Sequence, residues 1–85
     1  MKEEKIGRVS HYYNKIQVAI LILENKLSVG DTIHIKGHST DLTQKIESMQ
    51  IEHKSVSEAK EGDCIGIKVK EPVREHDEVY KVLEN

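Results

Sequence analysis

The chain of 85 residues contains one cysteine, Cys64, and this scarcity excludes an intramolecular disulfide and any zinc site built from several cysteines. A small domain without disulfides is typical of the reducing cytoplasm, where we expect this protein to reside. Long hydrophobic runs are also missing, because the longest, residues 18–23, is far shorter than the ~20 residues that cross a bilayer. The charged start, Met-Lys-Glu-Glu-Lys, lacks the apolar segment of a signal peptide. We therefore expect no contact with a membrane.

The sequence has no strong excess of charge of either sign, with 13 Lys and Arg against 15 Asp and Glu and a formal net charge of −2. Non-specific binding to nucleic acid depends on many contacts between Lys or Arg and phosphate, so the overall composition does not favour it. A local basic face is compatible with this balance. Eleven Lys and eleven Glu accompany only three Asn and three Gln, a bias that favours a thermophilic source.

No stretch rich in Gly, Pro or Ser divides the chain, and we expect one domain over residues 1–85 with its core at about 6–83. Apolar residues recur with a period of two, which is typical of β-strands. This alternation predicts six strands, at 5–13, 15–24, 31–36, 41–52, 63–70 and 78–83. Only residues 55–60 have helix-forming chemistry, and they are too few for more than one turn. The pattern favours an all-β fold: a single six-stranded, closed or nearly closed antiparallel β-barrel.

The longest predicted strand, 41–52, changes phase along its length. Leu42 and Ile46 occupy even positions, whereas Met49 and Ile51 occupy odd ones. One inserted residue near 47–48 accounts for the change, because a β-bulge shifts the alternation and bends the strand. We therefore expect the chain to turn a corner of the barrel at this point.

A two-residue unit recurs before three of the predicted strands. It is Gly30-Asp31, then Gly62-Asp63, then His76-Asp77. Glycine adopts a positive φ without strain, and the Asp side chain accepts hydrogen bonds from nearby backbone N–H groups, so the unit predicts tight turns. His76 takes the place of glycine in the third copy, where a left-handed backbone conformation costs more.

Five segments occur in an order that resembles a known family. They are Gly7-Arg8-Val9, Leu27-Ser28-Val29-Gly30-Asp31-Thr32-Ile33, Ser48-Met49-Gln50-Ile51, Ala59-Lys60-Glu61-Gly62-Asp63-Cys64-Ile65-Gly66-Ile67 and Val73-Arg74-Glu75-His76-Asp77. Over residues 6–82 this order resembles the second, β-barrel domain of translational GTPases of the elongation factor Tu type. The barrel is also similar to the C-terminal domain of some collagenase-like peptidases, whose relatives act in RNA modification. The first resemblance implies contact with RNA or the ribosome, and the second implies contact with an enzyme.

The residues that several enzyme classes need are missing. There is no Gly-x-x-x-x-Gly-Lys-Ser/Thr phosphate loop, so we expect no GTP binding. His34 and His38 are four residues apart, but on a strand and the turn after it, and we expect no metal and no other cofactor. Cys64 has no evident activating group, and the carboxylates fall in charged stretches rather than in apolar pockets. We therefore predict a non-catalytic module.

One predicted surface is a candidate binding site. Lys68 and Lys70 alternate with the apolar residues of their strand, so they share its outer face. Tyr12 and Tyr13 offer rings on which an unpaired base stacks, unless one of them completes the core. The candidate contacts for nucleic acid or a partner are Arg8, Tyr12, Tyr13, Lys68, Lys70 and Arg74.

The sequence leaves two functions open. The first is a stand-alone translation-factor-like barrel that binds RNA or a ribonucleoprotein, such as the ribosome, through this basic face. The second is a protein–protein accessory module, equivalent to the C-terminal barrel of a collagenase-like peptidase or an RNA-modification enzyme. An exposed edge strand would also allow two copies to pair, and the sequence does not fix the oligomeric state.

Overall fold

The computed structural model describes residues 2–83, which form strands, turns and loops without a helix. The strands are β1 (Lys2–Tyr13), β2 (Val18–Leu23), β3 (Leu27–Ser28), β4 (Thr32–Lys36), β5 (Asp41–Lys45), β6 (Met49–Ile51), β7 (Lys54–Val56), β8 (Glu58–Ala59), β9 (Cys64–Lys68) and β10 (Glu78–Leu83). The predicted all-β class is confirmed. Within residues 2–83 there is no helix that could span a membrane.

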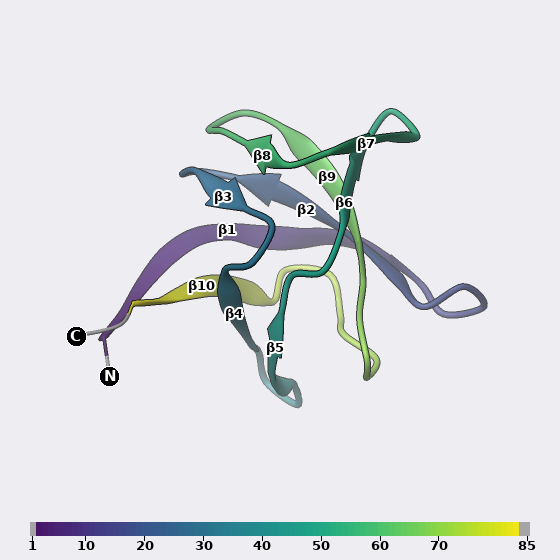
Figure 1. The fold of residues 1–85 in the computed structure, drawn as a ribbon. Coiled ribbons are helices and arrows are strands. Elements are labelled where there is room, and N and C mark those ends of the chain that lie inside the picture. The colour runs from purple at the N-terminus through teal and green to yellow at the C-terminus, as the bar shows by residue number, and fades with distance from the viewer. Residues whose placement is uncertain (1, 84–85) are drawn as a thin grey trace.

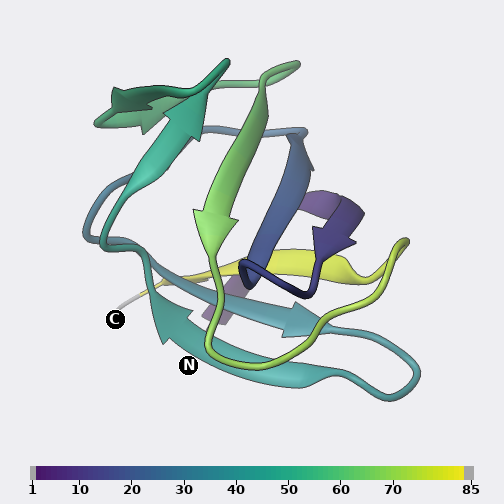
Figure 2. The same ribbon diagram turned by 90° about the vertical axis from the view of Figure 1, so that its right-hand side faces the viewer.

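Eight strands form one antiparallel sheet in the order β5-β4-β10-β1-β2-β9-β6-β7, and β3 pairs with β8 in a second, two-stranded sheet. The large sheet coils strongly, so that β4 and β5 pass beneath β2 and β9 (Figure 2). The long strand β1 curves through the middle of the molecule (Figure 1). It pairs with β10 from Lys2, opposite Leu83, onward, so the two ends of the described chain lie side by side.

The prediction of a six-stranded, closed or nearly closed barrel is wrong in two respects. The predicted strand 41–52 is two strands, β5 and β6, and the short strands β3, β7 and β8 are additional. Residues 55–60, where the sequence allowed a helical turn, belong mostly to β7 and β8. The sheet is also open, with β5 and β7 as its edges.

The predicted change of phase within 41–52 explains why the sheet stays open. Leu42, Gln44 and Ile46 face inward, then Glu47 and Ser48 are exposed, and Met49 is buried again. The chain therefore leaves the plane of β5 at 46–48 and approaches β9 as β6, where Gln50 lies opposite Gly66. β5 is therefore an edge strand that pairs with β4 alone. β9 pairs with β6 only at Gly66, so the rest of β9 has no strand beside it on the side of β6.

The side chain of Gln44 bridges the gap between β5 and β9. Its Nε2 donates to the carbonyl oxygen of Lys68 at 2.8 Å, and the backbone N–H of Lys70 donates to its Oε1 at 3.0 Å. A primary amide carries a donor and an acceptor, as a peptide group does, so one side chain takes the role of a missing strand. On the other side of β9, towards β2, the N–H of Val69 donates to the carbonyl oxygen of Gln17 at 2.9 Å.

Two irregularities bend β1 around the core. The pairing of β1 with β10 shifts register between Lys5 and Gly7, and its pairing with β2 shifts between Val9 and His11. Such bulges increase the local twist and bend of a strand. At Gly7 a Cβ atom would collide with the backbone carbonyl oxygen of Ile22, so only glycine allows β1 and β2 to approach this closely.

The core is filled by aliphatic side chains that alternate along the strands. The inner face of β2 contributes Ala19, Leu21 and Leu23, each exposed by 1% or less. The other large, fully buried side chains are Ile6, Val9, Leu27, Ile33, Ile35, Ile46, Met49, Ile65, Ile67 and Val79. The alternation that predicts the strands therefore also identifies their inner faces.

The three turns predicted from the Gly-Asp unit share one geometry. Gly30, Gly62 and His76 have φ of 99°, 91° and 75°. In each turn the carboxylate of the following Asp accepts the N–H of the residue three positions earlier at 2.9 Å. His76 therefore adopts the left-handed conformation that the sequence predicts for its position.

Replacing Gln44 by Leu should lower the free energy of unfolding by about 2–3 kcal/mol. The variant keeps most of the buried volume but leaves the carbonyl of Lys68 and the N–H of Lys70 without their partner. Urea titration followed by circular dichroism measures the change. Gln50→Leu, on the exposed side of β6, is the control and should stay within about 0.5 kcal/mol of the parent chain. Equal effects at both positions would contradict the bridging role of Gln44.

Replacing His76 by Gly should raise the free energy of unfolding by about 1 kcal/mol, because glycine adopts this positive φ without strain. The thermal midpoint of unfolding measures the change. His38→Gly is the control, because His38 is exposed in a loop and is not among the residues with positive φ. A His76→Gly variant no more stable than the parent would show that the turn carries no strain.

Candidate binding surface

The outer face of β1, β2 and β9 is ordered in rows by the pairing of the three strands. Tyr13 lies opposite Val18, which lies opposite Lys68. The next row contains His11, Ile20 and Gly66, and the third contains Arg8, Ile22 and Cys64. Directly paired residues place their side chains on the same face of a sheet, so these nine positions form one continuous surface.

Aliphatic side chains occupy the centre of this surface. Val18, Ile20 and Ile22 alternate with the buried residues of β2 and are only half-buried themselves. Tyr13 is 48% exposed beside them, and Ile16, in the turn before β2, is 59% exposed. We call the set Tyr13, Val18, Ile20 and Ile22 the β2 outer face.

The structure brings some of the predicted contact residues together and separates others. Tyr13 and Lys68 flank Val18 in one row, whereas Arg8 lies two rows away and forms an ion pair with Glu24 at 3.9 Å. Tyr12 points to the opposite side of the sheet and packs against the core, which is the alternative that the sequence leaves open.

Lys70 and Arg74 lie beyond the end of β9. Lys70 is exposed, and its backbone N–H is held by Gln44. Arg74 is also exposed, at the start of the third Asp turn, where its backbone N–H donates to the Asp77 carboxylate. The predicted basic face is therefore distributed over β1, the end of β9 and a loop. Whether these residues contact a ligand stays a prediction.

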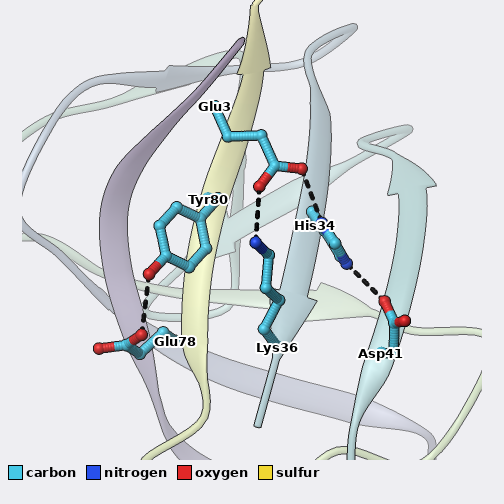
Figure 3. Close-up of polar contacts among 6 residues, drawn as sticks. All are labelled: Glu3, His34, Lys36, Asp41, Glu78 and Tyr80. Atoms are coloured by element: carbon cyan, nitrogen blue, oxygen red, sulfur yellow. Dashed lines mark hydrogen bonds and ion pairs between the residues drawn. The ribbon is translucent and has the colours of Figure 1, made fainter. Parts of the chain in front are cut away.

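A second outer surface, formed by β5, β4, β10 and β1, is covered by ionised side chains that pair with one another (Figure 3). At its centre the imidazole of His34 lies between two carboxylates. Its Nδ1 is 2.7 Å from Oε2 of Glu3, and its Nε2 is 2.5 Å from Oδ1 of Asp41. Nζ of Lys36 lies 3.0 Å from the other oxygen of Glu3.

The chain of contacts continues across β10. Nζ of Lys36 lies 4.8 Å from the centre of the Tyr80 ring, and the Tyr80 hydroxyl donates to Glu78 at 2.8 Å (Figure 3). Lys5 pairs with the same carboxylate at 3.3 Å. The charged groups of this cluster thus each face an opposite charge, and such pairs stabilise neighbouring strands.

The pairing shifts the protonation equilibria of the cluster. The hydrogen bonds to Asp41 and then to Glu3 raise the pKa of His34 above its ordinary 6.5. The bond to His34, followed by that to Lys36, lowers the pKa of Glu3. A protonated imidazole with both N–H groups directed at carboxylates offers no lone pair. In this state His34 neither accepts a proton nor binds a metal ion.

Other titratable groups are dispersed over the described part of the chain. Among residues 2–83, no three His, Cys, Asp or Glu side chains are grouped so that they would hold a metal ion. Cys64 is exposed on the outer side of β9. The cleft of about 630 Å³ beside the ionised surface is bordered by His34, Glu3, Lys81 and Asp31, whose charges pair with one another.

Sequence reasoning misses both outer surfaces as units. The β2 outer face has a signal, because 18–23 is apolar at every position and so supplies both faces of one strand. The cluster around His34 has none, since residues 3, 34, 36, 41, 78 and 80 meet only through the pairing of four strands.

Comparisons with known proteins identify relatives among proteases. No protein-family profile matches the chain. The chain is 44% identical over 81 residues to an uncharacterized protease of Methanocaldococcus jannaschii, covering 94% of this chain and 20% of that protein. It is 36% identical over 78 residues to a collagenase of Porphyromonas gingivalis, covering 89% of this chain and 22% of the collagenase. The chain thus spans about a fifth of the length of the curated relatives it matches.

A solved structure has the same fold. The C-terminal domain of a Geobacillus thermoleovorans protein assigned to the U32 peptidases superposes with a TM-score of 0.88 at 24% identity, covering 94% of this chain and 93% of that domain. The predicted similarity to the C-terminal domain of collagenase-like peptidases is therefore confirmed. The resemblance to the second domain of elongation factor Tu-type GTPases stays a prediction.

The stability of the chain should fall as the pH rises above 6.5 because His34 loses its proton. The pKa of His34 is raised in the folded chain, so its contribution is complete below 6.5 and disappears as the pH passes the folded value. Urea unfolding from pH 6 to pH 9 should therefore show a decrease that His34→Gln removes.

The titration of the His34 ring, followed by NMR, tests the cause directly. Its midpoint should lie above 6.5 and should decrease in Asp41→Asn, because Asp41 makes the largest contribution to the shift. Glu47→Gln, an exposed change between β5 and β6, is the control and should leave the midpoint unchanged. A midpoint at or below 6.5 in the parent chain would contradict the arrangement in Figure 3.

Proposed function

We propose that this chain is a non-catalytic accessory module that binds the catalytic portion of an enzyme similar to the U32 peptidases. One observation carries the proposal: 94% of the chain matches only 20% of the Methanocaldococcus jannaschii protease. A unit that corresponds to a fifth of a larger enzyme and has its own core is the usual form of an appended domain. Its natural partner is then the other four fifths of such an enzyme.

The geometry supports a binding role over a catalytic one. His34, the histidine at the centre of the ionised surface, is engaged by carboxylates at both ring nitrogens. The core is filled by aliphatic side chains, and the apolar surface lies on the outside of the sheet. Contiguous aliphatic groups that stay partly exposed are typical of surfaces that bind another protein.

Binding of RNA or a ribonucleoprotein is the second candidate function. It is favoured by Tyr13 and Lys68, which flank Val18 in one row, because an aromatic ring beside a cation suits an unpaired nucleotide. The remaining basic residues, Arg8, Lys70 and Arg74, extend the surface only at its ends. The aliphatic centre and the net charge of −2 favour a protein partner over RNA.

The proposal is tested with the Methanocaldococcus jannaschii relative, expressed without the segment that this chain matches. Isothermal titration calorimetry of this chain into the shortened protein should give a Kd of about 10 µM or tighter, within the range of specific protein pairs. The full-length relative is the control, because its own copy of the segment occupies the site. It should bind the added chain at least about tenfold more weakly.

The same titration after nuclease treatment separates the two candidate functions. A heat of binding that is still measured after nuclease treatment supports the accessory module. Absence of binding to the shortened relative, together with association that nuclease abolishes, would contradict it and favour the RNA-binding alternative.

A further inference from the structure

Strand β2, which lies between β1 and β9, is apolar on both of its faces. Ala19, Leu21 and Leu23 fill the core, and Val18, Ile20 and Ile22 point away from it. Antiparallel sheets with one face in water usually alternate between apolar and polar residues. A strand with aliphatic residues on both sides is typical of a sheet that is covered on both sides. Within residues 2–83 the inner residues of β2 are buried, whereas the outer ones stay partly exposed.

The neighbouring strands leave the β2 outer face accessible. Opposite Ile20, β9 has Gly66, where a Cβ atom would lie 3.5 Å from Cδ1 of Ile20 and 3.6 Å from Cγ1 of Val18. Because glycine has no side chain, these two aliphatic groups are not shielded from the β9 side. Tyr13 borders them on the β1 side and is 48% exposed.

The ionisable groups in the same rows are all basic apart from the thiol of Cys64 and the phenol of Tyr13. Arg8 lies in the row of Ile22, His11 in that of Ile20, and Lys68 in that of Val18. Arg8 and His11 have acidic neighbours in Glu24 and Glu75, at 3.9 Å and 2.9 Å. Lys68 has no carboxylate within 4.0 Å among residues 2–83. The surface therefore complements an apolar face that carries a carboxylate opposite Lys68.

The charges argue against a second copy of this chain as the occupant. A two-fold contact between two such faces would place Arg8 and Lys68 of one copy near the same residues of the other, and like charges oppose that arrangement. An RNA strand would match the lysine but would leave three aliphatic side chains facing phosphate or sugar.

We infer that the β2 outer face is the surface through which this chain docks on the remainder of a U32-peptidase-like enzyme, against an apolar face edged by a carboxylate that meets Lys68. This inference rests on the proposed function and names the interface that it uses. Ile20 lies at the centre of the contact, and Cys64, in the row of Ile22, lies at its border.

Binding to the shortened Methanocaldococcus jannaschii relative is then measured for variants of this chain. Ile20→Lys places a charge in the apolar centre and should weaken binding at least tenfold, which corresponds to about 1.4 kcal/mol. Lys68→Glu reverses the charge of an exposed side chain and should weaken binding about fivefold or more. Val29→Lys introduces the same charge at an aliphatic residue outside these rows that is 41% exposed, and it should change the Kd less than about twofold.

Alkylation of Cys64 gives a second readout that needs no substitution. Iodoacetamide modification, quantified by mass spectrometry, should be at least about tenfold slower in the complex than in the free chain, because the partner covers the thiol. Circular dichroism and urea unfolding of each free variant show whether it is folded. Lys68→Glu keeps the test decisive if Ile20→Lys does not fold.

The outcomes separate the interface from the proposed function. Binding that is insensitive to Ile20→Lys and Lys68→Glu, with Cys64 still reactive, overturns this interface and leaves the accessory role standing. Absence of any binding to the shortened relative overturns both. Dimerisation of the free chain in sedimentation velocity, abolished by Ile20→Lys, would assign the surface to a second copy. Binding of a fluorescent single-stranded oligoribonucleotide, abolished by the same variants, would assign it to RNA.

Discussion

The side-chain amide of Gln44 holds together two parts of the sheet that no backbone ladder joins. β5 ends where the chain turns at 46–48, and β9 extends past the single pair that connects it to β6. Between them the amide satisfies the carbonyl of Lys68 and the N–H of Lys70. Gln44 is 8% exposed, and both of these hydrogen bonds are partly buried, so losing them would be costly. The barrel-like shape thus depends on one buried polar side chain at the place where two strands do not pair.

Local features of the fold are predictable from the sequence because they depend on residues close together in the chain. The three Asp turns follow from the chemistry of positions 28–31, 60–63 and 74–77 alone. The change of phase between Ile46 and Met49 identifies where the chain turns, although the sequence predicts a bulge there within one strand and the structure has a break between β5 and β6. The open sheet is not predictable in this way. It depends on the direction that the chain takes between β5 and β6. It also depends on the Gln44 side chain, which links β5 to the end of β9 where no strand pairing does.

The ionised cluster illustrates what a single sequence cannot provide. His34 and Asp41 meet because β4 and β5 form a hairpin, but Glu3 reaches them only across β10 and β1. The register of β1 against β10 shifts near Ile6, which is a bulge that no local pattern announces. An error of one residue in that pairing would turn Glu3 to the other face of the sheet. The cluster therefore follows from the complete set of strand pairings, and no shorter segment predicts it.

The two outer surfaces differ in how much the fold explains them. On one of them the charges pair: Lys5 with Glu78, Lys36 with Glu3, and His34 with Asp41, so the fold accounts for that surface. The aliphatic residues on the outside of β2 receive no comparable explanation. Stability rests on the buried side chains and on the hydrogen bonds of Gln44 and the Asp turns, none of which requires an aliphatic side chain at Val18, Ile20 or Ile22. Threonine, which is also β-branched, would suit a solvated strand face equally well. Folding therefore does not require this face to be apolar, whereas contact with a partner protein would.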